Sequence, residues 1–322
     1  MSMPIYILKR ILQSIPLLIM VSILSFTIIK LSPIDPLAEL KLNPAISPQV
    51  LESEKQRLGL DKPVHIQYLN WAGNFIRGDL GVSVSGERVS NRLMERVPNT
   101  LLLTSVVIII TWLLAIPLGI YAALHWKSHF DRFLTVISSM GMAIPTFFFA
   151  LLLLIFAVKT GWFPVGGLTS VGFETFSLTH KILDIVHHLF LPVLVLATAS
   201  LAGLQRQMRG NLLDVLESDY VKMARAKGLP ENKVIYKHAV RNAINPLVTL
   251  LGFEFAALLN GAALTEFVFQ YPGLGRLILE AVMKSDMNLV MASLMIGTIM
   301  LIAGNLIADI LLKVVDPRVS LD

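Results

Sequence analysis

Three acidic side chains lie within or beside long apolar runs of the sequence: Glu254, Glu266 and Asp309. On insertion scales a carboxylate at the middle of a bilayer costs about 2.5–3.5 kcal/mol, so such residues face water or the interior of a helix bundle. Each could line a solute pathway or hold helices together. We favour the pathway for Glu254 and a structural role for Glu266, close to the end of its apolar run. For Asp309 both roles stay open.

The sequence offers little of the chemistry of an enzyme. It has no cysteine, which excludes disulfides and thiolate ligands. The neighbouring His187 and His188 would point apart on a helix and have no third ligand close in sequence, so we expect no metal site. No Gly-x-x-x-x-Gly-Lys-Ser/Thr run is present to hold ATP. We therefore expect a non-catalytic chain without a cofactor, whose energy comes from another protein.

The stretch from about 205 to 243 carries the strongest signal and is basic, with eight Lys/Arg and four Asp/Glu. Spacings of four, four and three residues predict one helical stripe made of Leu212, Leu216, Tyr220 and Met223. The opposite face is charged. An ordered, basic loop of this kind favours docking on another protein, and a solvated connector is the alternative.

A tight turn is predicted inside this stretch. Gly228 can adopt the left-handed conformation that ends a helix. Pro230 suits the first position of a second helix. Ala224 lies one helical turn before Gly228, where a small side chain would allow a partner's groove to approach closely. Arg225 and Lys227 could pair with acids around that groove, although exposed pairs contribute only about 0–1 kcal/mol each.

The elements that position these residues are membrane helices. Of the 322 residues, 55% are hydrophobic and only 15% are charged, more apolar surface than a soluble fold of this size can bury. Pro192 and several small residues make the fourth of the expected spans the least regular. Six stretches are long enough to cross about 30 Å of hydrocarbon: 11–31, 100–124, 133–158, 189–208, 244–269 and 287–313.

Positive charge predicts the orientation of these spans. Lys9 and Arg10 flank the first span, Lys127 and Arg132 lie in the short 125–132 loop, and the basic 205–243 loop belongs on the same, cytoplasmic side. Both termini are therefore expected in the cytoplasm. The net charge of +5 fits basic cytoplasmic loops better than nucleic-acid binding. The first span is expected to be a retained signal anchor.

The 31–98 segment falls outside and is expected to contain ordered helices. Ser47-Pro48 can start a short helix that Gly59 can end. A second helix is predicted to carry an apolar face with interfacial aromatic side chains, and it could either cap the outer mouth and meet a solute-delivering partner or lie on the bilayer for structural reasons. That face is formed by Val64, Tyr68, Trp71, Ala72 and Phe75.

The basic loop resembles a known family. The run Asp219-Tyr-Val-Lys-Met-Ala-Arg-Ala-Lys-Gly228-Leu-Pro is similar to the coupling-loop motif of ABC importer permeases. Its continuation, His238-Ala-Val-Arg-Asn-Ala-Ile-Asn-Pro246, resembles the dipeptide, oligopeptide and nickel branch. The general motif begins with Glu, which is absent here, and Pro246 falls further downstream than in sugar-type permeases. Both departures are usual in the peptide branch.

Further matches extend the resemblance over nearly the whole chain in the expected order. The most specific of them follows the fifth span. They are Arg57-Leu-Gly-Leu-Asp-Lys-Pro, Gly78-Asp-Leu-Gly-Val-Ser83, Ile116-Pro-Leu-Gly119, Ile144-Pro145, Glu266-Phe-Val-Phe-Gln-Tyr-Pro-Gly-Leu-Gly-Arg276, Asn305-Leu-Ile-Ala-Asp309 and Asp316-Pro-Arg318.

The resemblance implies an all-α membrane permease in the bacterial inner membrane that forms half of a translocation pathway. Its partners would be a second permease subunit, giving a heterodimer, two ATP-binding subunits on the cytoplasmic side, and an external solute-binding protein. ATPase coupling would fall on Tyr220, Ala224, Arg225, Lys227, Gly228 and Pro230. We divide the chain into an anchor and outer segment, 1–98, and a permease core, 99–322.

Two other functions are alternatives to this hypothesis. An ion-coupled secondary transporter also has acids in mid-span, but it often shows two related halves, and no internal repeat is evident here. An intramembrane enzyme would need paired acids, a Ser/His pair or a metal cluster in the spans. The sequence leaves the solute open among peptides, nickel and glutathione.

Overall fold

The computed structural model describes residues 3–31, 37, 41, 46–57 and 59–315, and the motif at 316–318 lies outside this part. Within it the chain is helical, with one isolated β-bridge between Val82 and Arg88. The helices are α1 (Met3–Leu31), α3 (Pro48–Arg57), α4 (Val64–Ile76), α5 (Val89–Leu124), α6 (His129–Ala143), α7 (Thr146–Thr160), η1 (Phe173–Thr175), α8 (Leu178–Leu216), α9 (Asp219–Ala226), η2 (Lys233–Val240), α10 (Arg241–Val268), α11 (Leu274–Met283) and α12 (Met287–Val315).

The chain is an all-α membrane protein. Among the described residues, four helices are long and apolar enough to cross a bilayer: α1, α5, α8 and α12. The bent pair α6 and α7 would make five if it counts as one span. The 28-residue helix α10 coincides with the expected stretch 244–269. Large apolar side chains remain exposed along α1 and α7, as expected for helices that face lipid.

The expected stretch 133–158 is occupied by two helices that meet at a break. α6 and α7 meet at an angle of 96°. Pro145 lies at the break, where it lacks an N–H and its ring disfavours a helical conformation of the preceding residue. Ile144 accordingly has φ −82° and ψ 121°, in the extended region.

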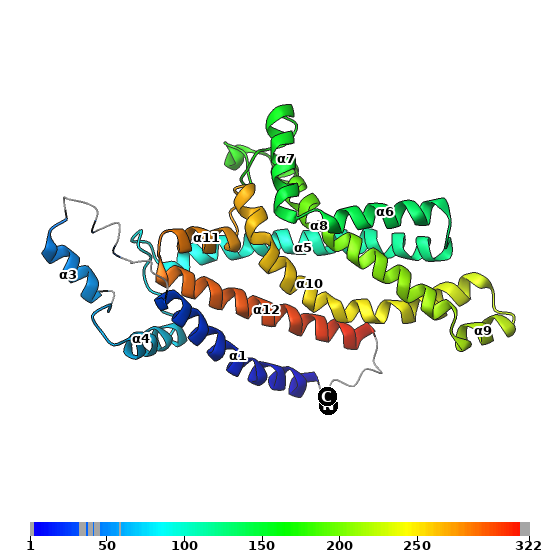
Figure 1. Ribbon diagram of the computed structural model, residues 1–322, viewed down its shortest axis with the longest axis horizontal. Helices are drawn as coiled ribbons and strands as arrows, with labels where there is room; N and C mark the ends of the chain where they lie inside the picture. Colours follow the sequence, from blue (N-terminus) through cyan, green and yellow to red (C-terminus); the bar gives the residue numbers. More distant parts are fainter. Residues whose placement is uncertain (1–2, 32–36, 38–40, 42–45, 58, 316–322) are drawn as a thin grey trace.

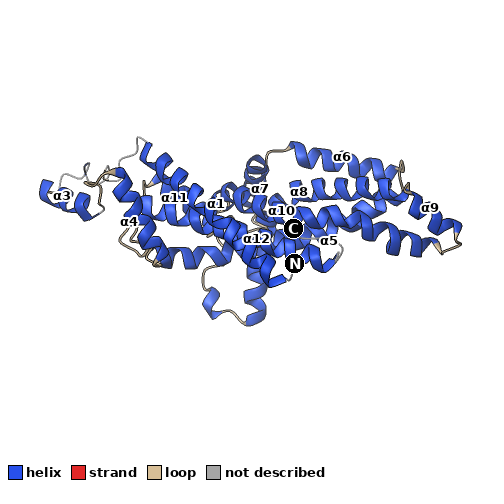
Figure 2. Ribbon diagram, turned by 90° about the horizontal axis from the view of Figure 1, so that it is seen from below, coloured by secondary structure: helices blue, strands red, loops and turns tan. Residues whose placement is uncertain are grey.

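The fourth expected span, 189–208, is longer and more regular than its sequence indicated. α8 has 39 residues and continues through Pro192. Close packing against α5 supports it: a Cβ on Gly119 would lie 2.7 Å from the Cβ of Met208, so only glycine allows this approach. The contacts between α5 and α8 are the most extensive between any two described helices. Figure 2 shows this layer of long helices from below.

The outer segment contains the two expected helices, α3 and α4, with Gly59 at φ +64° after the first. α4 packs on α1 through its aromatic face: the Tyr68 and Phe26 rings are 5.4 Å apart. The Tyr68 hydroxyl also lies 2.9 Å from Ser22 Oγ. The aromatic side chains of α4 therefore lie on one side of the helix, where Tyr68 contacts the first span.

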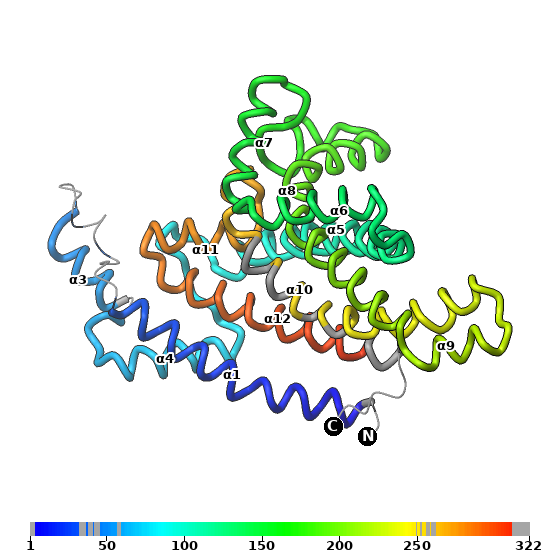
Figure 3. Tube along the Cα trace, turned by 45° about the vertical axis from the view of Figure 1, so that its right-hand side comes forward, coloured from blue at the N-terminus to red at the C-terminus, as the bar shows by residue number. Residues whose placement is uncertain are grey.

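The molecule is elongated, and the outer helices and the helix α9 lie at opposite ends. Figures 1 and 3 place α3 and α4 at one end of the long axis and α9 at the other. The long helices α5, α8, α10 and α12 lie between these ends.

Candidate functional site

The strongest candidate site is the hairpin formed by α9 and η2, residues Asp219–Val240, which we call the α9–η2 hairpin. It joins the end of α8 to the start of α10, and the second helix is a π-helix rather than the expected α-helix. No break separates η2 from α10, because Val240 and Arg241 both keep right-handed helical backbone angles. The hairpin is thus continuous with a long helix on one side.

The predicted stripe of Leu212, Leu216, Tyr220 and Met223 was wrong in its second half. α8 ends at Leu216, and Ser218 has an extended ψ of 150° before α9 begins. Because of this break, the side chains of α9 do not continue the apolar face of α8. Leu212 is fully buried, whereas Tyr220 and Met223 are 43% and 58% exposed.

The turn after α9 is closed by backbone hydrogen bonds, as the sequence predicted. The N–H of Gly228 donates to the carbonyl of Arg225 at 2.9 Å, and that of Leu229 to Ala224 at 3.4 Å. Gly228 has φ +73°, which favours glycine. Pro230 then starts the second helix, and its carbonyl accepts from Lys233 N at 2.8 Å.

Side chains brace the hairpin on two sides. Arg225 spans the turn and donates to both carboxylate oxygens of Glu231, the shortest distance being 2.8 Å from Nη2 to Oε1. This pairing lowers the pKa of the Glu231 carboxyl. On the other side, Asn242 Nδ2 donates to the Tyr220 hydroxyl at 3.0 Å. Arg225, expected to reach toward acids of a partner, is therefore occupied within its own chain.

A buried apolar cluster joins the hairpin to the membrane helices. From α9 it includes Val221, fully buried, and Ala224, 7% exposed, packed with Val234 of η2 and with Leu212 of α8. The small side chain of Ala224 therefore serves the approach of α8 and η2 rather than facing outward. A displacement of the hairpin must move α8 and α10 with it, since close-packed interiors transmit strain.

The outward surface of the hairpin combines apolar and basic side chains. Met223 and Tyr236 are each 58% exposed, and the Lys222 side chain is 63% exposed. Lys227, Gly228 and Pro230 are also exposed. Exposed Met and Tyr are enriched on surfaces that a protein partner covers. Tyr236 was missed from the sequence, since the phase of η2 follows from the turn at Gly228 rather than from the stripe in α8.

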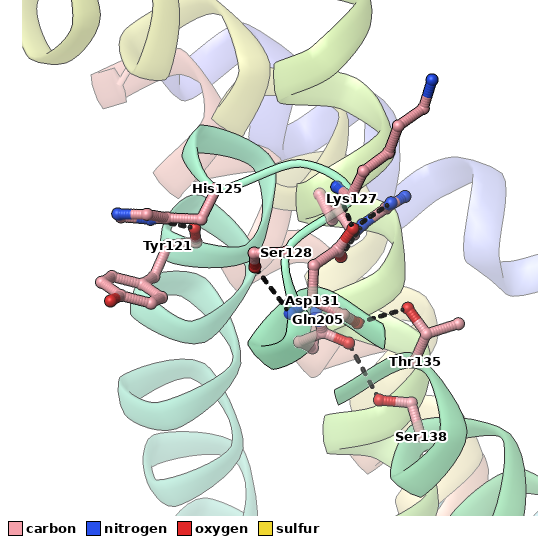
Figure 4. Close-up of polar contacts among 9 residues, drawn as sticks. Tyr121, His125, Lys127, Ser128, Asp131, Thr135, Ser138 and Gln205 are labelled. Carbon is pink, nitrogen blue, oxygen red and sulfur yellow. Dashed lines mark hydrogen bonds and ion pairs between the residues drawn. The ribbon is translucent and has the colours of Figure 1, made fainter. Parts of the chain in front are cut away.

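A second cluster, which the sequence did not reveal, ties α6 to α8 (Figure 4); we call it the α6–α8 clamp. Asp131, 3% exposed, accepts from Arg209 Nε at 2.6 Å and from Nη2 at 2.9 Å. Further along the helices, Ser138 Oγ donates to Gln205 Oε1 at 2.9 Å. Arg206 Nη2 donates to Ser139 Oγ at 2.9 Å.

The carboxylate of Asp131 is held as a charged group. The Arg209 guanidinium, with a smaller contribution from the backbone N–H of Lys127, lowers the pKa of Asp131 below its ordinary value although burial opposes this. Ser128 caps α6, because its Oγ accepts from Asp131 N at 3.2 Å. The short 125–132 loop is thereby fixed to α8, about two turns before that helix ends at Leu216.

The three acids of the apolar runs lie in different surroundings. Glu254, partly buried, accepts from Trp112 Nε1 at 2.6 Å. Glu266 is fully buried and accepts from Thr100 Oγ1 at 2.7 Å and from Arg276 N at 2.9 Å. Glu266 therefore joins α5, α10 and α11.

Asp309 forms an ion pair with Arg10, 3.0 Å from Arg10 Nη2, and so connects α12 to α1. The role of Glu254 in the pathway stays a prediction. The histidines His187 and His188 each lie 2.8 Å from a backbone carbonyl oxygen, of Trp162 and Asp184. No group of three metal-ligating side chains occurs among the described residues.

These features define a class: a multi-pass membrane protein that presents an ordered, basic hairpin rigidly joined to its membrane helices. Comparison with known sequences then gives the family. The chain belongs to the binding-protein-dependent transport system inner membrane components, whose sequence model matches residues 115–321. The N-terminal model of the same family matches residues 3–104.

Relatives of the same length support this assignment. The chain is 43% identical to the oligopeptide transport system permease protein AppB of Bacillus subtilis over 318 residues, 98% of this chain and 99% of that protein. It is 35% identical to the di/tripeptide transport system permease protein DppB of Pseudomonas aeruginosa over 329 residues, 98% of each.

Proposed function

We propose that the chain is the permease subunit of an ATP-driven importer of di- or oligopeptides and forms half of the translocation pathway. The observation that carries this proposal is the α9–η2 hairpin, which is ordered, exposed and packed into the ends of α8 and α10. The peptide class rests on the two relatives, both named as peptide transport permeases. An ion-coupled carrier is not favoured, because it gives this hairpin no role.

The hairpin would act as the mechanical contact with an ATPase. A push on α9 displaces α8 and α10 together through the buried cluster around Val221 and Val234. The α6–α8 clamp carries the same displacement to α6. Because the chain bends by 96° at Pro145, α6 would move with the hairpin while α7 could stay in place. Catalysis of ATP hydrolysis would belong to the partner subunits.

The same proposal includes the arrangement in the inner membrane. We infer six spans, with α6 and α7 together as a broken third span and both termini in the cytoplasm. The anchor and outer segment, 1–98, would face an external solute-binding protein, and the core, 99–322, would pair with a second permease subunit. Two ATP-binding subunits would cover the α9–η2 hairpin and its counterpart.

Purification and transport test this proposal together. The chain is expressed with candidate second-permease, ATPase and binding-protein genes from its own genome, and the purified complex is reconstituted. We expect an ATPase to co-purify and peptide uptake to require ATP and the binding protein. Met223→Asp should release the ATPase, because it places a charge in the apolar part of the surface.

Val171→Asp is the matched control. Val171 is a fully exposed valine in the loop between α7 and α8, far from the hairpin along the chain. This variant should keep both the ATPase and uptake. Peptide uptake by the chain alone, driven by a proton gradient, would contradict the proposal.

A further inference from the structure

A polar cleft of about 400 Å³ lies at the outer-segment end of the molecule. Its walls come from α4, from the turn at 79–82 and from the first residues of α12, with Phe26 of α1 at its base. Pockets of about 300–1,000 Å³ accommodate small ligands. The region is at the end where Figure 1 shows α4 beside α1, opposite the α9–η2 hairpin.

The walls of this cleft are held in place by hydrogen bonds. Asp79 N donates to the carbonyl of Asn74 at 2.9 Å, and Asp79 Oδ1 accepts from Gly81 N at 3.0 Å. Asn288 Nδ2 donates to the carbonyl of Val82 at 3.0 Å, which fixes the turn to α12. The cleft is therefore preformed rather than a gap between unconnected loops.

Gln67 lines the cleft and has one buried polar atom without a partner among the described residues. Gln67 Nε2 donates to the carbonyl of Lys62 at 2.6 Å, which fixes the orientation of the side-chain amide. Its Oε1 is buried and accepts no hydrogen bond from the described residues. An unpaired buried acceptor costs about 1–3 kcal/mol.

The chemistry of the lining defines that ligand. The described lining residues include five carboxamides, one ammonium group, Lys62, and one carboxylate, Asp79. Carboxamides both donate and accept, as backbone amides do, so they match a peptide backbone. The single cation and single acid match the carboxylate and ammonium of its termini. The carboxamides are Gln56, Gln67, Asn70, Asn74 and Asn288.

We propose that this cleft binds a short zwitterionic peptide, with Gln67 and the asparagines on its backbone, Asp79 on its ammonium and Lys62 on its carboxylate. The proposal rests on the proposed function, which places the cleft on the outer side. It adds a peptide site on the permease itself, distinct from any site on the external binding protein. A lipid chain would not match a lining of amides, and a metal ion would need a ligand cluster that the described residues lack.

A chemical double-mutant cycle tests the assignment of Asp79. The complete importer in lipid nanodiscs, without the binding protein, is titrated with trialanine and with N-acetyl-trialanine by saturation-transfer NMR. Asp79→Asn keeps the oxygen that accepts from Gly81 N. It should weaken trialanine about tenfold, the loss of one charge-assisted hydrogen bond, and leave the acetylated peptide unchanged. Gln67→Leu should weaken both peptides.

Asp61→Asn is the matched control, because Asp61 lies in the same segment but does not line the cleft. It should change neither affinity. The proposal is overturned if wild type binds neither peptide, if Asp79→Asn weakens both equally, or if the variants weaken docking of the binding protein while leaving trialanine unaffected. ATP-driven uptake with the binding protein, measured on the same preparations, tests the proposed function separately.

Discussion

Gly228 is constrained by its backbone and not by lack of space. Its φ is +73°, and a Cβ built there would meet nothing within 4 Å. Gly228→Val should therefore cost about 1–2 kcal/mol through the left-handed backbone alone. Insertion should stay near normal, while uptake falls about tenfold as the tight turn is depopulated. Expression level and ATP-driven uptake measure the two effects.

Gly228→Asn separates conformation from size, since asparagine tolerates the left-handed region. The Asn variant should transport nearly as well as wild type, although its side chain is about as large as valine. Equal loss in both variants would mean that a partner contacts the Gly228 surface directly and that the turn geometry is not the cause.

Asp131 gives a pH-dependent prediction with a defined sign. Because Arg209 lowers the pKa of Asp131 in the folded protein, its stabilisation is fully present above the ordinary carboxyl pKa of about 3.9 and is lost as the pH falls through the lower folded value. Asp131→Asn should lower the free energy of unfolding by about 1–3 kcal/mol at neutral pH. The gap in Tm between wild type and variant should stay constant from about pH 8 to pH 5 and narrow below about pH 4.

Asp219→Asn is the control for this measurement. Its side chain is 99% exposed and pairs with Lys222 at 3.4 Å, an exposed pair that contributes about 0–1 kcal/mol. Its Tm should match wild type throughout. A gap for Asp131→Asn that widened on acidification would contradict the charged state of the clamp.

At the scale of the elements, Glu266 holds the joint of α5, α10 and α11. Glu266→Ala would leave the Thr100 hydroxyl and the Arg276 N–H without their acceptor and open a cavity, at a cost of about 2–5 kcal/mol. Glu266→Gln keeps one acceptor oxygen and should lose less. Thermal unfolding in detergent measures the Tm of both variants, and Glu266→Ala should have the lower Tm. Glu87→Ala, whose side chain is 67% exposed, is the control and should leave Tm unchanged.

The sequence predicted the elements with regular patterns and missed those that depend on contacts between distant segments. The outer helices α3 and α4 and the turn at Gly228 follow from local signals, namely caps, periodic apolar residues and a glycine. The role of Ala224 did not follow, because its burial depends on Val234, which lies beyond the turn.

The α6–α8 clamp shows why part of the candidate site could not be predicted from the sequence. Ser128 and Asp131 are a local cap signal, but Arg209 is 78 residues away and looks like an ordinary basic loop residue. The break in α8 at Ser218 had a visible signal, a serine followed by Asp219, which is typical of a helix start. The apolar periodicity continues across that break, so the predicted stripe was extended beyond the end of α8.

At the scale of the whole molecule, the number of membrane crossings determines on which side of the membrane each end of the molecule lies. The outer segment and the α9–η2 hairpin lie at opposite ends of the long axis (Figures 1 and 3). The number of crossings between them decides whether the proposed topology is possible. The bent pair of α6 and α7 decides this number, since a 96° bend fits either a broken span or a re-entrant loop.

Cysteine labelling decides this, and the sequence has no cysteine to interfere. Val171→Cys, after the bent pair, should react with a membrane-impermeant maleimide in intact spheroplasts. Met223→Cys, on the α9–η2 hairpin, should react only after permeabilisation. Leu113→Cys, 68% exposed within the apolar helix α5, should react in neither case, because the thiolate does not form in hydrocarbon.

The sides on which Val171 and Met223 lie depend on each other, because each crossing of the membrane reverses the side. If α6 and α7 re-entered on the cytoplasmic side, Val171 would be cytoplasmic, α8 would run outward, and the α9–η2 hairpin would lie outside, beyond the reach of a cytoplasmic ATPase. Labelling of Met223→Cys from outside would therefore contradict both the six-span topology and the coupling role. Outside labelling of Val171→Cys together with protection of Met223→Cys requires that the bent pair crosses the membrane and that α8 returns.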